Sequence, residues 1–308
     1  MLAARRVTLQ LSLVAGLVAL SIFFPSSGGA PRGLSAQAAI GVQDMHKGFD
    51  KRCTPGEGTM QNWWTNSQYW YIGIYIGGSN KSCKNDTNLT ASWVSDVNST
   101  NGMNWSFIPL YVGLQDPCQP PSSGLATFST DSTTANNEGS NAAGYAISDA
   151  QNLGFSNSII YFDLESWNGT GGNCLSSAEA FVSGWVTELQ SRGWTAGLYG
   201  SAGGSRMDDM YHLNHNPTDA FIAAYNDDVS PWNISGFPNS DWEFDHRIHQ
   251  YHRDTSATSC NGGICLQIDK NCAIGKTAKA WAYTTETSEP SGSSESDGPA
   301  EDGPQCGT

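Results

Sequence analysis

Two carboxylic acids stand two residues apart at the end of an apolar run, "IIYFDLESW" at residues 159–167. If this run is a β-strand, Asp163 and Glu165 point from the same face, because side chains alternate between the two faces of a strand. Carboxylates held this close cannot both ionise easily, so at least one has a raised pKa and keeps a proton near neutral pH. A protonated acid beside an ionised one is the pair that cleavage of a glycosidic bond requires.

The elements that must position these acids are short apolar runs separated by helical or loop segments. β-Strands are predicted at residues 48–51, 69–78, 106–115, 158–166, 194–201, 219–226, 247–252 and 264–271. Helices are predicted between them at residues 88–97, 141–155 and 176–193. Apolar strands that alternate with helices are typical of a parallel sheet covered on both faces, and eight units in about 240 residues match a closed (β/α)8 TIM-type barrel of the α/β class. An open doubly wound sheet is the alternative, but the chain has no glycine-rich phosphate fingerprint.

Two further acids fall where a barrel places its functional residues, at the C-terminal ends of the strands. Asp50 ends the first predicted strand and Asp269 lies in the last, and these two strands are neighbours in a closed barrel. We therefore predict that four acids gather at one end of the barrel. The alternative is a structural ion-pair network in which the acids are partnered by Lys51, Arg247 or Lys270.

The composition limits the class of partner. The formal net charge of −14 would repel a phosphate backbone, so a nucleic acid is not expected. The 11 Trp and 11 Tyr residues suit neutral sugars, whose apolar faces stack on aromatic rings, although such residues also build ordinary cores. No motif predicts a cofactor. Three cysteines near the histidines of "HRIHQYH" (246–252) raise the question of zinc, but without a CxxC or HExxH motif we expect no metal site.

The predicted strands together resemble a known family. The segments "GFDK", "YIGIYIGG", "FIPLYVGLQ", "IIYFDLES", "GLYGS", "FIAAYN", "RIHQY" and "LQIDKN" are similar, in this order, to the glycoside-hydrolase-like barrel domain catalogued as domain of unknown function 1906. That family is related to the family 25 lysozymes. The resemblance covers residues 46–283, which it identifies as a single glycoside-hydrolase-like TIM-barrel domain.

The resemblance to the lysozymes implies a role for each acid. Their site combines an Asp of strand one, a D-x-E of strand four and a late Asp, which implies Asp50, Asp163, Glu165 and Asp269 here. The glutamate would donate the proton, and the neighbouring aspartate would hold the 2-acetamido group of the sugar during retaining, substrate-assisted cleavage. Strand seven has His249 where the lysozymes often have Trp, which suggests that one sugar-stacking ring is missing.

The sequence leaves two alternative functions. The first is an exported glycoside hydrolase that acts on a cell-wall or other N-acetylated polysaccharide. The alternative is a catalytically inactive barrel that binds glycans at the cell surface, and retention of all four acids favours the enzyme. The candidate substrate-binding residues are Tyr75, Tyr111, Trp167, Tyr199, Tyr225 and Gln250. We expect a monomer whose partner is a polysaccharide.

Both ends of the chain are expected to lie outside the barrel. Residues 1–38 have the features of a signal peptide, with Arg5 and Arg6 before an apolar run at 11–24, and the paired arginines admit a twin-arginine route. An uncleaved anchor is the alternative, and no later segment is long and apolar enough to span a membrane. Residues 284–308 contain six acids and no base, which predicts a disordered, dispensable acidic tail. The protein is expected to be secreted or held at the cell surface.

The eight cysteines all follow the predicted leader, and an even number in an exported chain indicates disulfides. Cys53 and Cys83 follow the first two strands, and Cys118 and Cys174 follow the next two, so each pair is predicted to clamp adjacent loops. Cys260 or Cys265 is expected to pair with Cys272 or with each other, which leaves Cys306 in the tail without an assigned partner.

Overall fold

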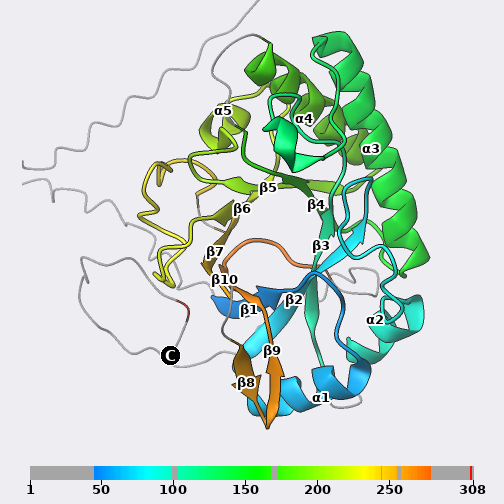
Figure 1. Ribbon diagram of the computed structural model, residues 1–308, viewed down its shortest axis with the longest axis vertical. Coiled ribbons are helices and arrows are strands. Elements are labelled where there is room, and N and C mark those ends of the chain that lie inside the picture. The colour runs from blue at the N-terminus through cyan, green and yellow to red at the C-terminus, as the bar shows by residue number, and fades with distance from the viewer. Residues whose placement is uncertain are drawn as a thin grey trace, which may run out of the picture. The chain divides into compact units, whose positions relative to one another are not determined.

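The computed structural model describes residues 45–98, 103–167, 173–243, 245–254, 258–278 and Cys306. Eight of its strands close into one barrel in the order β1-β10-β7-β6-β5-β4-β3-β2 (Figure 1). The predicted closed α/β barrel is therefore confirmed. The predicted signal peptide and nearly all of the predicted acidic tail lie outside the described residues. Among the described residues, no helix has the length and apolar character that crossing a membrane requires.

The barrel strands lie close to the predicted apolar runs. They are β1 (His46–Asp50), β2 (Tyr69–Gly77), β3 (Ser106–Tyr111), β4 (Ile159–Leu164), β5 (Thr195–Ser201), β6 (Asp219–Ala223), β7 (Arg247–Arg253) and β10 (Asp269–Ala273). All pairs between neighbouring strands from β1 to β7 are parallel. They supply the parallel sheet that the apolar runs predicted.

The last strand differs from the prediction in direction and extent. β10 runs antiparallel to both of its neighbours, β1 and β7. The predicted strand at 264–271 is divided, because its first part forms β9 (Ile264–Leu266), which pairs with β8 (Ser259–Asn261) in a separate hairpin. The disulfide between Cys260 and Cys265 fixes this hairpin. A parallel return to the barrel needs a long crossover, usually a helix, whereas an antiparallel return can follow a short connection.

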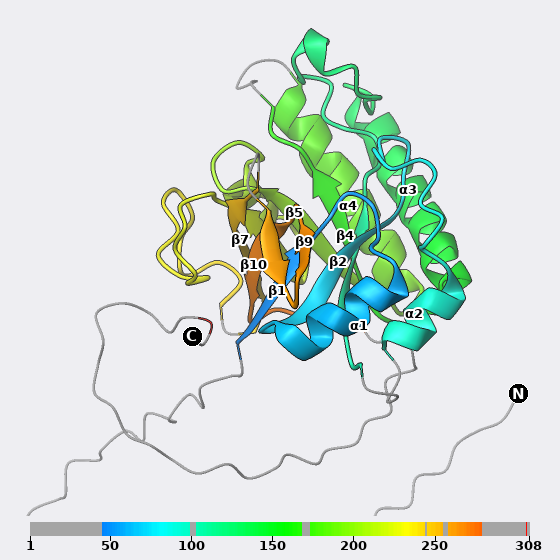
Figure 2. The same cartoon turned by 60° about the horizontal axis from the view of Figure 1, so that its bottom comes forward.

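Among the described residues, helices follow only the first five strands. They are α1 (Glu57–Asn66), α2 (Ala91–Val97), α3 (Ser132–Asn152), α4 (Cys174–Ser191) and α5 (Met207–Tyr211), with a short 3₁₀ turn at Pro121–Ser123. α1 and α5 were not predicted, and α3 begins nine residues before the predicted start, where Asp131 caps it by accepting a hydrogen bond from the Thr134 N–H. Among the described residues, no helix follows β6 or β7, so loops cover that side of the barrel (Figure 2).

The longest helices, α3 and α4, pack side by side along the barrel (Figures 1 and 2). Two glycines permit the close approach. A Cβ atom on Gly139 would lie 2.0 Å from the carbonyl oxygen of Phe181, and one on Gly184 would lie 2.0 Å from that of Asn136. Neither backbone could move aside without moving the whole helix, so both positions require glycine.

The core has two parts, one outside and one inside the barrel. The larger part lies between the strands and the helices and contains Phe49, Trp63, Phe162 and Trp185. The inner part fills the barrel with Tyr71, Ile108, Leu110, Tyr161, Phe221 and Ile248. Polar side chains occupy the rest of the interior, at the rim where the parallel strands end.

The four disulfides include both predicted clamps, Cys53–Cys83 and Cys118–Cys174. Cys260 pairs with Cys265, which is one of the two alternatives left open, and Cys272 pairs with Cys306. Cys306 therefore has a partner in β10, and it is buried. No free cysteine remains, so no thiolate is left for the zinc site considered near residues 246–252.

Candidate active site

Asp50 and Asp269 lie opposite each other at the rim of the barrel, in register across β1 and β10. Asp50 is the last residue of β1 and Asp269 is the first residue of β10. Because β10 is antiparallel, its first residue lies at the same end of the barrel as the last residue of β1. The predicted neighbourhood is therefore correct, although the strand that supplies Asp269 runs in the opposite direction from the one expected.

Asp50 is almost fully buried, with 1% of its surface exposed, and three side chains hydrogen-bond to it. The Tyr75 hydroxyl donates to Oδ1 at 2.9 Å, while the amides of Gln250 and Asn271 donate to Oδ2 at 2.6 and 3.2 Å. Burial raises the pKa of Asp50 to about 6, although the three hydrogen bonds oppose this change. Gln250 in turn accepts a hydrogen bond from the Tyr199 hydroxyl at 2.9 Å, so its amide is fixed from both sides.

Asp163 lies at the end of β4 with 4% of its surface exposed. Burial raises its pKa well above the usual value, and the charges of Glu165 and Asp50 raise it further. Its Oδ1 atom is buried and has no hydrogen-bond partner among the described residues. An unpartnered buried carboxyl oxygen in a native fold calls for an explanation, because such groups are normally satisfied.

Glu165 and Asp269 stand nearer to solvent than the other two acids. Partial removal of water raises the pKa of the Glu165 carboxyl, and the positive charge of Arg253 opposes the increase. Burial and then the charge of Asp50 raise the pKa of Asp269 to about 8, again against Arg253. The four acids thus act on one another electrostatically, and the group favours holding protons near neutral pH.

The alternative structural network receives no support from the ion pairs. Among the described residues, none of the four acids forms an ion pair with Lys51, Arg247 or Lys270. Arg247 is instead buried outside the barrel, where it donates to main-chain carbonyl oxygens that include those of Pro231 and Trp242.

Gln115 holds the segment that carries Asp163 and Glu165, and the sequence did not reveal this role. Its side-chain amide donates to the Asp163 carbonyl oxygen at 2.7 Å, and its side-chain oxygen accepts from the Glu165 N–H at 2.7 Å. Gln115 is fully buried. It therefore takes the place of a strand partner just beyond the end of β4 and fixes the backbone from which both acids project.

Four of the six candidate substrate-binding residues lie around these acids. Tyr75, Tyr199 and Gln250 belong to the hydrogen-bonded network of Asp50, and the Tyr225 hydroxyl lies 3.4 Å from that of Tyr199. The Tyr225 ring is half exposed, and the Arg253 guanidinium lies over it at 5.3 Å. These rings supply an aromatic surface beside the carboxyl groups.

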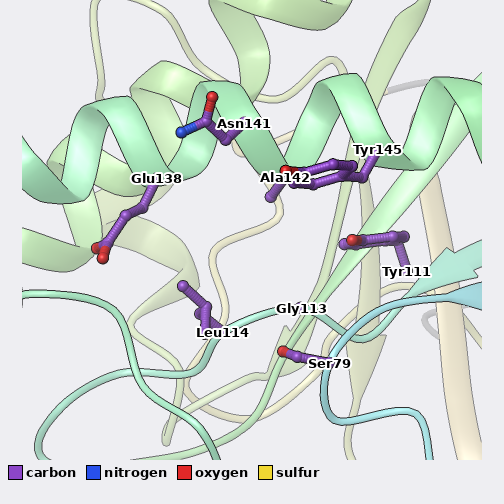
Figure 3. Close-up of a pocket in the computed structure, with 8 residues that line it drawn as sticks. All are labelled: Ser79, Tyr111, Gly113, Leu114, Glu138, Asn141, Ala142 and Tyr145. Atoms are coloured by element: carbon purple, nitrogen blue, oxygen red, sulfur yellow. The ribbon is translucent and has the colours of Figure 1, made fainter.

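The other two candidates lie elsewhere, which corrects the prediction. Trp167 is buried in the apolar core outside the barrel. Tyr111 also faces outward, where its ring stacks on Trp185 with 6.0 Å between centroids. It lines a separate pocket of about 310 Å³ against α3, together with Tyr145 on the helix (Figure 3). Both faces of β3 are apolar, so the sequence did not show which face the Tyr111 ring occupied.

His249 also faces away from the rim. Its ring is fully buried, and its two nitrogens lie 2.6 Å from the Ser230 carbonyl oxygen and 2.9 Å from the Ala224 carbonyl oxygen. The replacement of Trp by His in strand seven therefore removes no ring from the cluster of acids. In this chain the position serves to anchor the loop that follows β6.

The comparisons with known proteins agree with this architecture. The model of the Rv2525c-like, glycoside hydrolase-like domain matches residues 61–273. None of the curated proteins compared with the chain matched it. The crystal structure of an uncharacterized B. stearothermophilus protein is similar to it at 17% identity with a TM-score of 0.50, covering 74% of this chain and 95% of that one.

Two further solved structures are similar to the chain at lower scores. The catalytic domain of endolysin Ply40 from bacteriophage P40 of Listeria monocytogenes has 16% identity and a TM-score of 0.47, covering 76% of this chain and 95% of that one. The Clostridium perfringens spore cortex lytic enzyme SleM has 12% identity and a TM-score of 0.43, covering 74% and 67%. Because the family model spans most of the barrel, from α1 to the end of β10, the chain belongs to the Rv2525c-like, glycoside hydrolase-like family.

Proposed function

We propose that the protein is an exported glycoside hydrolase that cleaves an N-acetylated cell-wall polysaccharide, with Glu165 as the general acid. The observation that carries the proposal is the buried, unpartnered Oδ1 atom of Asp163, which lies under the electrostatic influence of Glu165 and Asp50. A carboxyl oxygen in this state offers a hydrogen-bond acceptor that the fold itself leaves unused. The N–H of a sugar's 2-acetamido group is the kind of donor that would satisfy it.

The chemistry divides between the two acids of the D-x-E segment. Glu165 gives its proton to the glycosidic oxygen, and the partial removal of water that raises the pKa of its carboxyl group favours the protonated form that this step needs. The acetamido carbonyl oxygen attacks the anomeric carbon while Asp163 holds the acetamido N–H, and the leaving sugar departs. Water then opens the cyclic intermediate with the Glu165 carboxylate as base, so the configuration is retained.

The remaining side chains supply charge to this site and line it. Asp50 holds negative charge near the positive charge that develops on the sugar, and Tyr75 and Gln250 fix the orientation of its carboxylate. Asp269 faces Asp50 and carries the proton that this pair keeps near neutral pH. The half-exposed Tyr225 ring would stack on a sugar at the mouth of the site. The predicted leader and four disulfides support an extracellular site of action.

The test is hydrolysis by the purified protein of peptidoglycan and of chitin-type oligosaccharides, followed as the appearance of new reducing ends. The wild type should release them with retained configuration at the new anomeric carbon, and Glu165→Gln should not. Glu57→Gln, at an exposed position at the start of α1, is the matched control and should remain active. Binding of either glycan without any release by the wild type would reject the hydrolase and support the inactive glycan-binding barrel.

A further inference from the structure

We propose that Asp208, His212 and Asp241 bind a divalent transition-metal cation such as Zn²⁺. Each residue offers one ligand atom, and these atoms all lie within 4.8 Å of one another. Asp208 belongs to α5 and His212 follows the end of that helix, while Asp241 lies in the loop between β6 and β7. The site is formed by elements other than those that carry the four rim acids.

Asp241 provides the observation that points to a ligand. Only 2% of its surface is exposed, and its Oδ2 atom has no hydrogen-bond partner among the described residues. The other oxygen, Oδ1, accepts a hydrogen bond from the Ser240 hydroxyl at 3.2 Å. A carboxylate oxygen of Asp208 lies within 4.8 Å of an oxygen of Asp241. Two carboxylates held together in this way need a shared cation, either a proton or a metal ion.

The two arginines near the Asp208 and Asp241 carboxylates make their hydrogen bonds to other groups. Arg206 forms an ion pair with Asp209 at 2.6 Å, on the same short helix as Asp208. The buried Arg247 guanidinium lies near Asp241, but its hydrogen bonds go to main-chain carbonyl oxygens, that of Asp241 among them. The Asp208–Asp241 pair thus keeps a negative charge that a metal ion would neutralise.

The donor set indicates which class of cation would bind. One imidazole nitrogen and two carboxylate oxygens suit zinc and related first-row ions, whereas calcium prefers six to eight oxygen ligands. Ligands around a tetrahedral zinc ion lie about 3.4 Å apart, with bonds of about 2.0–2.2 Å. The side chains of Asp208 and His212 are 51% and 66% exposed, so both are free to turn toward the ion, and water can complete the coordination.

A second Asp–His–Asp cluster in the same protein provides an internal comparison. His252 contacts Asp227 through Nδ1 and Asp254 through Nε2. Both ring nitrogens are therefore already engaged, and neither is available to a metal without breaking a hydrogen bond. In His212, by contrast, Nε2 lies 3.5 Å from Asp208 Oδ1, which is too far for a strong hydrogen bond.

The metal ion would have a structural consequence for this side of the barrel. α5 has only five residues, and the loop that contains Asp241 covers strands that no described helix covers. A metal ion held by both elements would join the short helix to the loop. We therefore expect metal binding to stabilise the folded protein by mass action, because the unfolded chain does not hold the three ligands together.

The experiment is calorimetric titration of Zn²⁺ into the purified protein after treatment with EDTA, together with thermal melts. One Zn²⁺ should bind and raise the melting temperature, and Co²⁺ in its place should give the visible absorption of a tetrahedral complex. His212→Ala and Asp208→Asn, both at exposed positions, should fold normally and weaken Zn²⁺ binding at least about tenfold, the loss that even an outer-shell partner can cause.

Two matched controls identify the site, and neither they nor the titration depend on any hydrolytic activity. His215→Ala alters an exposed histidine three residues along the chain, and His252→Ala alters the second cluster, so both should bind Zn²⁺ as the wild type does. The proposal is overturned if the wild type binds no Zn²⁺, which would leave a shared proton between Asp208 and Asp241. It is equally overturned if His212→Ala binds Zn²⁺ as tightly as the wild type.

Discussion

Asp50 and Asp269 face each other across an antiparallel pair of strands, and residues directly opposite in such a pair project from the same face of the sheet. Both side chains are carboxyl groups, and two like charges in this position would destabilise the sheet. Burial raises the pKa of Asp50 to about 6 and that of Asp269 to about 8. Near neutral pH the pair therefore carries a proton that two exposed aspartates would have lost.

The first prediction concerns the pH dependence of stability. The folded protein keeps a proton on Asp269 that the unfolded chain releases near the ordinary value of 3.8, so this group lowers the free energy of unfolding as pH rises from 3.8 to about 8. Asp269→Asn removes that loss. The variant should melt higher than the wild type at pH 8, by roughly 2–4 °C for each kcal/mol gained.

The same variant should melt together with the wild type near pH 3, below the ordinary value of 3.8, where Asp269 is mostly protonated in both the folded and the unfolded state. Thermal melts at the two pH values are sufficient, with the exposed Glu57→Gln variant as control. If Asp269→Asn melted higher than the wild type by the same amount at both pH values, the charge of Asp269 would not be the cause of the difference in melting temperature.

The second prediction concerns Glu165, which no described ion pair stabilises. Glu165→Gln keeps the shape of the side chain, removes the proton donor and relieves its repulsion with Asp163. We expect hydrolysis to be abolished while the melting temperature stays unchanged or rises. Asp163→Asn should also lose activity, because it changes the group that would hold the acetamido N–H. A structural ion pair would behave differently, since removing one partner of a buried pair costs about 3–5 kcal/mol. Marked destabilisation by Glu165→Gln would therefore reject the catalytic interpretation.

The sequence predicted the barrel well because strands with two buried faces leave an apolar signature. Alternation along a single strand predicted that Asp163 and Glu165 share a face; in the structure β4 ends at Leu164, between them, and the charge of Glu165 raises the pKa of the buried Asp163. The sequence placed Asp269 beside Asp50 although it assigned the wrong direction to the last strand, because the chain order alone made the first and last strands neighbours. The direction depends on the short connection through the β8–β9 hairpin, which has no strong pattern of its own.

Other parts of the site could not be predicted from the sequence. Gln115 and Asn271 act through hydrogen bonds to residues that are 48 and 221 positions away along the chain. Nothing in their local sequence indicates such partners. Tyr111 was misplaced for a related reason, because β3 is apolar on both faces and its alternation carries no information about direction. The proposed cation site likewise depends on Asp241 folding back onto α5.

The third prediction tests the role of Gln115 in holding the D-x-E segment. Gln115→Ala leaves the Asp163 carbonyl and the Glu165 N–H without their partner in a buried setting. Each lost partner costs about 1–3 kcal/mol, so the variant should be destabilised by a few kcal/mol in chemical denaturation. Any hydrolysis should fall as well, because the backbone of both acids loses its support. Gln119→Ala is the control, since Gln119 donates a single exposed hydrogen bond of 3.2 Å to the Glu165 carbonyl. Equal stability of the two variants would contradict the proposed role of Gln115.

The last prediction concerns the end of the chain, where the sequence indicated a dispensable tail. The disulfide between Cys272 and the buried Cys306 joins that end to β10, a strand of the barrel. Closing a loop of this length restricts the unfolded chain and stabilises the fold by about 2–4 kcal/mol. Both truncation after residue 284 and Cys306→Ser should therefore lower the melting temperature by several degrees. Because Cys306→Ser keeps every other residue, a similar loss in both variants would assign the effect to the bridge rather than to the acidic segment. If truncation had no effect, or if peptide mapping without reduction found Cys272 joined to another cysteine, the bridge would play no part in stability.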